Sequence, residues 1–185
     1  MMKKLISGVN VELVKGNIAA QKDLSAVVNA ANAWLQPGAG VAGAIHRGAG
    51  PGLADECKAL APIKPGDAVI TGGHKLPNHY VIHCLGPVYG VDEPASEILA
   101  DCYINALRVA EQHKVDSIGF PAISTGVFGY PVEAAAEVAL RTVIHEIPGL
   151  RYMRRVRFVL FHDAALKIHE NMLSLLISEQ NKRVT

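Results

Sequence analysis

The sequence has almost no net charge and few aromatic residues. Its 185 residues include 18 Lys and Arg against 17 Asp and Glu, which gives a net charge of +1. This balance gives no electrostatic reason to expect nonspecific binding to DNA or to a membrane surface. Aromatic residues make up 5% of the chain, few for a domain that stacks successive bases, so a nucleotide- or RNA-binding domain is the weakest functional alternative. A small discrete ligand fits the composition better.

Cysteines are also scarce, and they are not arranged for chemistry. Cys57, Cys84 and Cys102 are widely spaced and form no CxxC pair, which is typical of a reducing compartment. No two His or Cys residues stand at i, i+4 on an expected helix, so we expect no metal and no cofactor. The N-terminal apolar run breaks at Ser7 and Gly8, too early for a signal peptide. We therefore expect a cytoplasmic protein.

One uncharged stretch, residues 24–45, is long enough to imitate a membrane span. It contains Asn29, Asn32, Gln36 and three glycines, polar or irregular positions that lipid would leave unsatisfied. We interpret it as a buried strand and loop over a ligand site, and we expect no membrane association.

Short apolar strands alternate with helical patterns along the whole chain, whose length suits a single domain over residues 1–185 with a polar, frayed tail at 179–185. The pattern predicts a three-layer α/β/α sandwich with a central mixed, mostly parallel sheet. The expected strands are Val9–Lys15, Ala26–Ala30, 67–71 and 78–84 as an antiparallel pair, 117–123 and 156–161; the expected helices are 41–47, 51–60, 95–113, 132–146 and 164–178.

Two glycine-bearing loops each follow a buried strand and lead into a helix. The first contains Gly38, Gly40 and Gly43 with only Ala and Val between them, and the second spans residues 124–131. In α/β sheets ligands bind beyond the carboxyl ends of the strands, where both loops fall. Backbone N–H groups at a helix start hold anions without Lys or Arg, and neither loop contains Lys. Two such loops predict a diphosphate ligand.

The string from Gly38 to Gly43 also matches GxGxxG, the pattern of dinucleotide folds. Seven residues, 31–37, separate it from its strand, and no acidic residue follows at the required spacing, so this match is weak. Asn29 and Asn32 carry both donors and acceptors suited to the cis-diol of a sugar. The alternative is that they bond local backbone and shape the turn, which we favour for Asn29.

Four motifs in this order, NAAN, GAGVAGAIHRGAG, VIHCLGP and PAISTGVFGYP, resemble the macrodomain family, especially its MacroD-type hydrolases and viral members. The resemblance covers the chain from Val9 to Leu176. It implies an α/β/α domain that binds ADP-ribose. Members either recognise ADP-ribosylated proteins or hydrolyse ADP-ribose esters such as O-acetyl-ADP-ribose, ADP-ribose 1''-phosphate and ADP-ribosyl carboxylates.

The resemblance also implies roles for individual residues. Asn32, at the end of NAAN, would bond the distal ribose beside the scissile bond and is the candidate catalytic residue. One side of the diphosphate would meet Ala39, Gly40 and Val41, and Phe128 would cover the distal ribose. The other side would meet Ser124, Thr125, Gly126, Val127 and Phe128.

At the adenine end the family usually has Gly-Asp-Ile, whose Asp accepts a bond from the adenine amine. This chain has Gly16, Asn17 and Ile18 instead, so the charge is lost and binding should be weaker or less selective for adenine. The residue that stacks on adenine should lie at the end of the last strand. Phe161 and His162 are both candidates.

The catalytic carboxylate of MacroD-type members has no counterpart here, because Ala42 stands at its position. Losing a positioned base should slow hydrolysis by about 10²–10⁴-fold if nothing replaces it. Viral macrodomains carry the same Gly-Val-Ala-Gly string and are hydrolytic, which implies that a substrate phosphate oxygen helps hold the water. Two hypotheses follow: a hydrolase of O-acetyl-ADP-ribose or mono-ADP-ribosyl esters, and a reader that binds ADP-ribose with little turnover.

Other candidate bases fit less well. His46 follows the first glycine loop, but we expect it to lie along the helix in a structural role. His83 and Cys84 are neighbours on a strand and therefore point to opposite faces of the sheet, which excludes a Cys-His dyad between them.

Overall fold

The computed structural model of the protein describes residues 1–184 and contains one seven-stranded sheet, in the order β1-β2-β7-β6-β3-β5-β4. The five inner strands run parallel, and the edge strands β1 and β4 are each antiparallel to their neighbour. The strands are β1 Met2–Ile6, β2 Val9–Lys15, β3 Ala26–Ala30, β4 Ala68–Gly72, β5 Tyr80–Cys84, β6 Ser117–Phe120 and β7 Arg155–Leu160.

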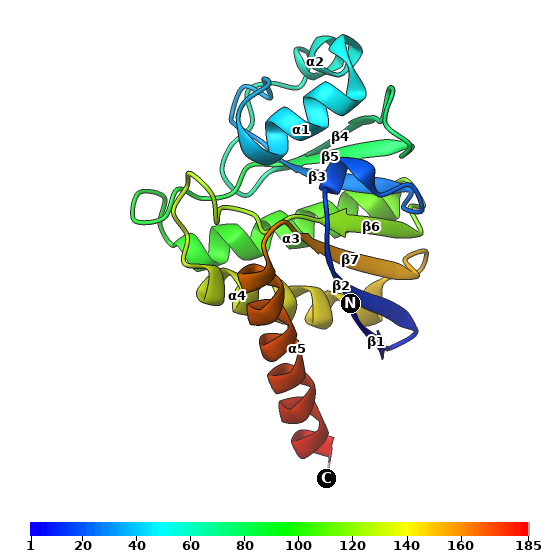
Figure 1. The fold of residues 1–185 in the computed structure, drawn as a ribbon, viewed down its shortest axis with the longest axis vertical. Coiled ribbons are helices and arrows are strands. Elements are labelled where there is room, and N and C mark those ends of the chain that lie inside the picture. The colour runs from blue at the N-terminus through cyan, green and yellow to red at the C-terminus, as the bar shows by residue number, and fades with distance from the viewer. Residues whose placement is uncertain (185) are drawn as a thin grey trace.

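Helices cover both faces of this sheet (Figure 1). They are α1 Gly40–Ala49, α2 Pro51–Cys57, α3 Ala95–Gln112, α4 Val132–Glu146 and α5 Asp163–Val184, with short 3-10 turns η1 Ile18–Ala20 and η2 Ile147–Gly149. None of the helices within residues 1–184 is long and apolar enough to cross a membrane. The predicted α/β/α sandwich with a mixed, mostly parallel sheet is confirmed.

Each helical layer encloses its own core. Between the sheet and α3, α4 and α5, the rings of Tyr103, Phe120 and Phe158 pack with centroids 5.0 and 5.8 Å apart along this series. On the other face, Ile45 of α1 and Leu53 of α2 pack on strands β3 and β5. Strand β3 packs on both cores, with Ala26 and Val28 on one side and Val27 on the other, which is why it is a short run of Ala and Val without polar alternation before Asn29.

Most predicted elements are present, but three of them end at least three residues from the predicted position, and one strand was missed. β6 ends at Phe120, α2 ends at Cys57, and α5 continues to Val184, so the expected frayed tail from Glu179 is wrong for the described residues. Residue 185 lies outside them. Glu179 accepts a hydrogen bond from Arg141 of α4 at 3.1 Å, a contact between helices that the local sequence does not reveal.

The missed strand is β1. It is an edge strand with three exposed residues among its five, and its two lysines suit the open edge of a sheet. Its apolar residues are too few to show a period of two, because only its ends, Met2 and Ile6, reach the core.

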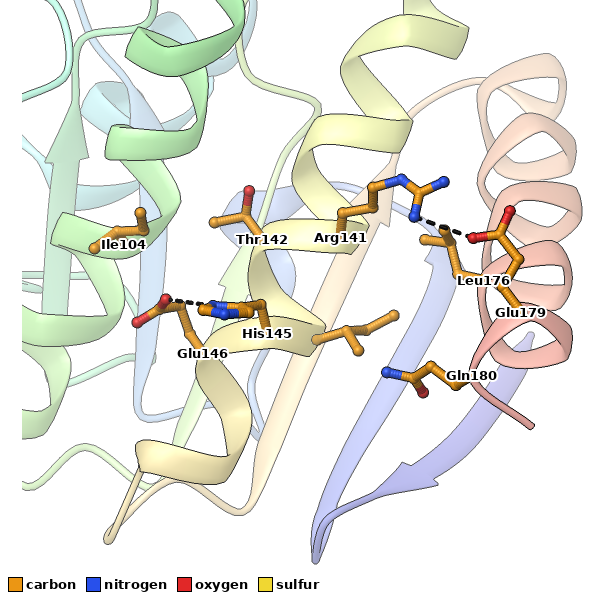
Figure 2. A pocket seen from close by; sticks show the side chains of 9 residues that line it. Ile104, Arg141, Thr142, His145, Glu146, Leu176, Glu179 and Gln180 are labelled. Atoms are coloured by element: carbon orange, nitrogen blue, oxygen red, sulfur yellow. Dashed lines mark hydrogen bonds and ion pairs between the residues drawn. The ribbon is translucent and has the colours of Figure 1, made fainter. Parts of the chain in front are cut away.

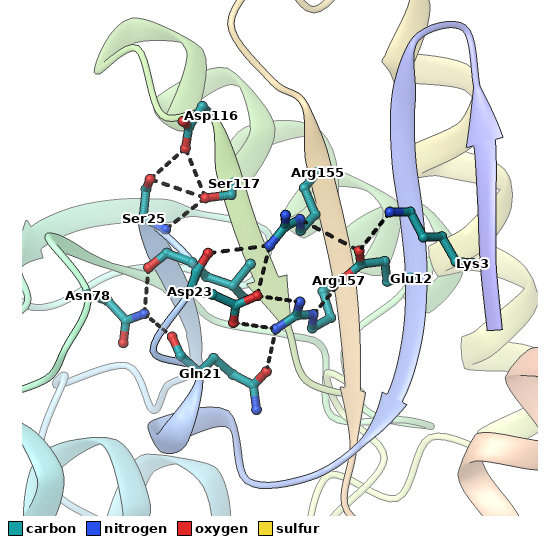
Figure 3. A network of polar contacts seen from close by, with 11 residues as sticks. Lys3, Glu12, Gln21, Asp23, Ser25, Asn78, Asp116, Ser117, Arg155 and Arg157 are labelled. Atoms are coloured by element: carbon teal, nitrogen blue, oxygen red, sulfur yellow. Dashed lines mark hydrogen bonds and ion pairs between the residues drawn. The ribbon is translucent and has the colours of Figure 1, made fainter. Parts of the chain in front are cut away.

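A network of charged side chains joins β7 to the segment between η1 and β3 (Figure 3). Arg157 donates to Glu12 of β2 at 2.7 Å and, through two nitrogens, to both oxygens of Asp23 at 2.8 Å. Arg155 also donates to Asp23 at 2.8 Å. Glu12 is only 4% exposed, and its ion pairs with Arg157 and Arg155 offset the cost of burying its carboxylate. The network fixes the segment that follows η1 to the face of the sheet.

This network predicts a loss of stability in acid. The hydrogen bonds from Arg157 lower the pKa of Asp23 from 3.8 to about 2, so the native state favours the ionised carboxylate. Its contribution is present above pH 4 and is lost as the pH falls toward 2. Because Asp23 is more than half exposed, we expect less than about 1 kcal/mol. In urea unfolding, Asp23→Asn should be less stable than wild type at pH 6 but not at pH 2; equal differences at both pH values would contradict this.

Candidate functional site

Helix α1 begins without any side chain to cap it. Its N-cap residue is Ala39, and its first turn contains no acidic residue. The first helical hydrogen bond runs from the N–H of Gly43 to the carbonyl of Ala39, so the N–H groups of Gly40, Val41 and Ala42 precede it. Gly40 has a φ of +57°, which favours glycine at this turn. The end of the helix is thus open to an anion.

Glycine is also required where the loop before α1 folds back on the helix. A Cβ atom at Gly43 would lie 2.4 Å from the carbonyl oxygen of Gly38. Only glycine, which has no Cβ atom, allows the backbone of Gly38 to approach this closely. Gly43 therefore lets the loop that precedes α1 pack against the first turn of the helix.

The second loop, after β6, turns its backbone toward the same space. Ser124 has a φ of +65°, and its carbonyl accepts from the N–H of Tyr130 at 2.9 Å. Thr125 closes the turn by donating its hydroxyl to Ala122 at 2.8 Å. Within residues 1–184 the N–H groups of Gly126, Val127 and Phe128 have no acceptor. They are the donors that the sequence predicted for this loop.

The two loops enclose a cleft of about 270 Å³ at the carboxyl ends of β3 and β6. All of its lining residues are uncharged. The hydroxyl of Ser124 is buried and has no partner among the described residues, so the cleft holds a polar atom with unused bonding capacity. The lining residues are Ala30, Ala31, Asn32, Gly38, Ala39, Gly40, Val41, Ala42, Gly86, Ala122, Ile123, Ser124, Gly126, Val127 and Phe128.

The cleft brings together most of the predicted binding residues, with Asn32 at one wall. Asn32 accepts from the N–H of Gln36 at 3.0 Å and donates to its carbonyl at 2.9 Å. The side chain of Asn32 therefore bonds local backbone and shapes the turn, which was the alternative interpretation. It also lines the cleft, as sugar recognition requires. One amide hydrogen and one lone pair remain for a ligand. Of the eight residues predicted to meet the diphosphate, Ala39–Val41 and Ser124–Phe128, Thr125 is the one that lies outside the lining.

Asn29 lies away from the cleft. Its side chain is 1% exposed and its Nδ2 lies 3.1 Å from Nδ1 of His83 on β5, so it bonds a neighbouring strand. The expected bond to local backbone is wrong. The Nε2 of His83 in turn lies 2.9 Å from the hydroxyl of Thr71 and 3.8 Å from Sγ of Cys57.

None of these buried groups is poised for nucleophilic chemistry. Burial raises the pKa of Cys57 to about 11 and lowers the pKa of His83 to about 3. Cys84 points to the other face and contacts the carbonyl of Cys102, which confirms that it forms no dyad with His83. His46 is 6% exposed, and burial lowers its pKa; it does not line the cleft, in agreement with a structural role.

The remaining predicted residues lie at the same edge of the sheet, after β7 and β2, which are one and two strands from β6. The N–H of Gly16 donates to the carbonyl of Leu160 at 2.9 Å, which aligns the ends of β2 and β7, and Asn17 and Phe161 follow directly after these ends. Phe161 is 72% exposed and contacts the exposed ring of His162 edge-on, at 5.1 Å between centroids. Ile18 is buried in the core under α1, so only its backbone can reach a ligand.

A larger hollow, about 440 Å³, lies between α3, α4 and α5 (Figure 2). It lies at the C-terminal end of α4, whereas the cleft borders the loop that precedes this helix. Its charged groups bond each other: Arg141 donates to Glu137 and Glu179, and His145 lies 3.1 Å from Glu146. The hollow therefore offers no unpaired charge to a ligand. In residues 1–184 no three His, Cys, Asp or Glu side chains are placed to hold one metal ion.

Sequence reasoning missed the wall of the cleft formed by Ala30, Gly86 and Ala122. A Cβ at Gly86 would lie 2.1 Å from the hydroxyl oxygen of Ser124, so this glycine makes room for the second loop. The sequence did contain a signal for Gly86, because this glycine follows a strand, β5, that ends at the same carboxyl edge of the sheet as the strands before both loops.

The fold and the site together define an α/β/α domain with an uncharged cleft between two sets of backbone N–H donors at the carboxyl edge of its sheet. The sequence model of the Macro domain matches residues 28–139. A protein of Klebsiella pneumoniae named O-acetyl-ADP-ribose deacetylase is 44% identical over 88% of this chain and 95% of its own. The chain belongs to the macrodomain family.

Solved structures of other macrodomains have the same fold as this chain. The Oceanobacillus iheyensis macrodomain with ADP is 38% identical, with a TM-score of 0.93, over 96% of this chain and 97% of that one. The Trypanosoma brucei macrodomain in complex with ADP-ribose is 36% identical, with a TM-score of 0.82, over 87% of this chain and 68% of that one.

Proposed function

We propose that this macrodomain binds ADP-ribose in the cleft and hydrolyses O-acetyl-ADP-ribose or mono-ADP-ribosyl esters on acidic side chains. The proposal rests on two groups of backbone N–H donors that have no acceptor in the described chain. One group is at the uncapped start of α1, the other is in residues 126–128, and they lie on opposite sides of one cleft. Two such donor sets match the two phosphates of a diphosphate. Relatives named O-acetyl-ADP-ribose deacetylase support the reaction.

In the proposed complex the distal ribose lies beside Asn32 and under Phe128, and the base lies toward Asn17 and Phe161 or His162. The diphosphate lies between Gly40 and the second loop. No carboxylate lines the cleft in the described part of the chain, so the attacking water is held by a substrate phosphate oxygen while Asn32 orients the ribose. Proximity and preorganised N–H groups then supply most of the rate. The proposed reaction needs neither metal nor cofactor, and the proposed location is cytoplasmic.

The second candidate function is a reader that binds ADP-ribosylated proteins with little turnover. Ala42 favours it, because the cleft wall has a methyl group where a base could stand. Calorimetry with ADP-ribose tests binding, and mass spectrometry of O-acetyl-ADP-ribose and of an automodified transferase, each incubated with the protein, separates hydrolase from reader. No binding at high micromolar protein would overturn both. Binding that falls steeply with salt would instead favour nucleic acid.

The contact between Gly43 and Gly38 gives a prediction about affinity. Gly43→Ala places a methyl group against the carbonyl of Gly38, so the loop must move away from the start of α1. We expect the affinity for ADP-ribose to fall about tenfold, equivalent to about 1.4 kcal/mol, by calorimetry. Gly149→Ala is the control, since nothing lies within 4 Å of its added methyl group. Unchanged affinity in Gly43→Ala would show that the loop does not shape the phosphate site.

A further inference from the structure

Among the described residues that line the cleft, only Asn32 and Ser124 have polar side chains. Asn32 uses half of its amide on the backbone of Gln36. Ser124 is 6% exposed, and its hydroxyl has no partner within residues 1–184. A buried hydroxyl without a partner costs free energy until a ligand supplies one. Ser124 is therefore the side chain of the cleft whose hydrogen-bonding capacity is wholly unused.

The hydroxyl of Ser124 lies near the segment that carries Asn32. Ser124 follows β6, but a Cβ atom at Gly86, which follows β5, would collide with its hydroxyl oxygen. Because β3 lies between β6 and β5 in the sheet, the side chain of Ser124 crosses the end of β3. The N–H of Ala31 donates to the carbonyl of Cys84 at 2.9 Å, so Asn32 and Gly86 leave the sheet side by side. The hydroxyl of Ser124 and the amide of Asn32 thus belong to the same part of the cleft.

The second loop holds this hydroxyl in place. The φ of +65° at Ser124 is fixed by the bond from Tyr130 to its carbonyl, and the bond from Thr125 to Ala122 closes the turn around it. Burial leaves the side chain no access to solvent in which to reorient. A ligand therefore meets a preorganised hydroxyl, which can both donate and accept one hydrogen bond.

The proposed hydrolysis needs an acceptor at this place. A water molecule that attacks an ester directs a lone pair at the carbon, so its two hydrogens have to be held by two acceptors. One acceptor is the phosphate oxygen of the substrate. The unpaired backbone groups on both sides of the cleft are N–H donors, and the free lone pair of Asn32 serves the ribose. The oxygen of Ser124 is the side-chain acceptor that remains.

We infer that Ser124 is a catalytic residue whose hydroxyl oxygen accepts a hydrogen bond from the attacking water and so orients it. This inference rests on the proposed function, because it concerns the water of that reaction. With O-acetyl-ADP-ribose, the water oxygen bonds to the acyl carbon, the bond from this carbon to the ribose oxygen breaks, and a water proton ends on that oxygen. The hydroxyl of Ser124 keeps its own proton throughout, so it orients the water without acting as a base.

The test removes the hydroxyl in two ways. Ser124→Gly keeps the backbone, because glycine favours a φ of +65°, and Ser124→Ala keeps the Cβ atom. In both variants kcat for O-acetyl-ADP-ribose should fall by about tenfold or more, while the affinity for ADP-ribose, measured by calorimetry, stays within about twofold of wild type. If affinity falls and kcat does not, the hydroxyl binds a phosphate and the inference is wrong. A fall in kcat in Ser124→Gly alone would reflect a loosened loop and would also contradict it.

Ser117→Ala is the matched control, since Ser117 is a buried serine at the opposite end of β6. Its hydroxyl accepts from the N–H of Ser25 at 2.8 Å, far from the cleft. This variant should lower the unfolding midpoint and keep kcat within about twofold; an equal fall in kcat would show that lost stability explains the effect. Failure of wild type to bind ADP-ribose or to hydrolyse its acetyl ester counts against the proposed function, whereas hydrolysis that survives both Ser124 variants overturns only this inference.

Discussion

Asn32→Ala is expected to lower the turnover of O-acetyl-ADP-ribose by about 100-fold or more. The substitution removes the polar group at the wall of the cleft and also both hydrogen bonds that hold Gln36. Loss of one preorganised donor at a reacting centre typically costs about 10²–10³ in rate, and misplacement of the ribose adds to this. Initial rates over a range of substrate concentrations measure the effect and separate kcat from KM.

Gln36→Ala is the control for the loop. The side chain of Asn32 bonds the backbone and not the side chain of Gln36, so this variant keeps both bonds while shortening a side chain that does not line the cleft. It should retain turnover within about twofold, since exposed substitutions are usually near neutral. If Asn32→Ala also stays within this range, Asn32 does not orient the ribose. A change confined to KM would show that it contributes to binding alone.

Ala42→Asp is expected to raise kcat by about 100-fold. Ala42 lines the cleft in the first turn of α1, and its side chain points away from water, with 6% exposed. A carboxylate there would be ionised, because it lies at the positive end of the helix, and it could accept a proton from the attacking water. Repulsion between this carboxylate and the diphosphate should raise KM at the same time. Steady-state rates with O-acetyl-ADP-ribose measure both parameters.

Ala42→Asn separates charge from size. The amide has the shape of the carboxylate but cannot take a proton, so kcat should stay near that of wild type. An equal gain in both variants would show that filling the cleft wall, and not general base catalysis, raises the rate. No gain in Ala42→Asp would mean that the water is already held well enough without a protein base.

The general position of the site could be predicted because it depends on local rules. A glycine-rich segment after a buried strand has to lie at the carboxyl edge of a parallel sheet, and two such segments on neighbouring strands have to face each other. β3 and β6 are neighbours in the sheet, so Gly40 and Gly126 meet across the cleft. No tertiary information beyond the sheet topology was needed.

Other features depend on contacts between distant segments, which local patterns do not encode. Asn29 and Asn32 belong to one motif, yet Asn29 bonds His83, 54 residues away, while Asn32 faces the cleft. The position of each on or beyond the strand decides this, because side chains alternate between faces until β3 ends at Ala30. The orientation of the Asn17 amide likewise follows from η1, a 3-10 turn of three residues that has no periodic pattern.

The uncharged lining of the cleft determines how binding responds to its surroundings. Among the described residues, none that borders the cleft has a side chain that gains or loses a proton near neutrality. A diphosphate in this cleft is bound by peptide dipoles, whose strength does not vary with acidity. Affinity for the phosphates should therefore stay constant from mildly acidic to mildly basic conditions, and any pH dependence of turnover belongs to the substrate and its water.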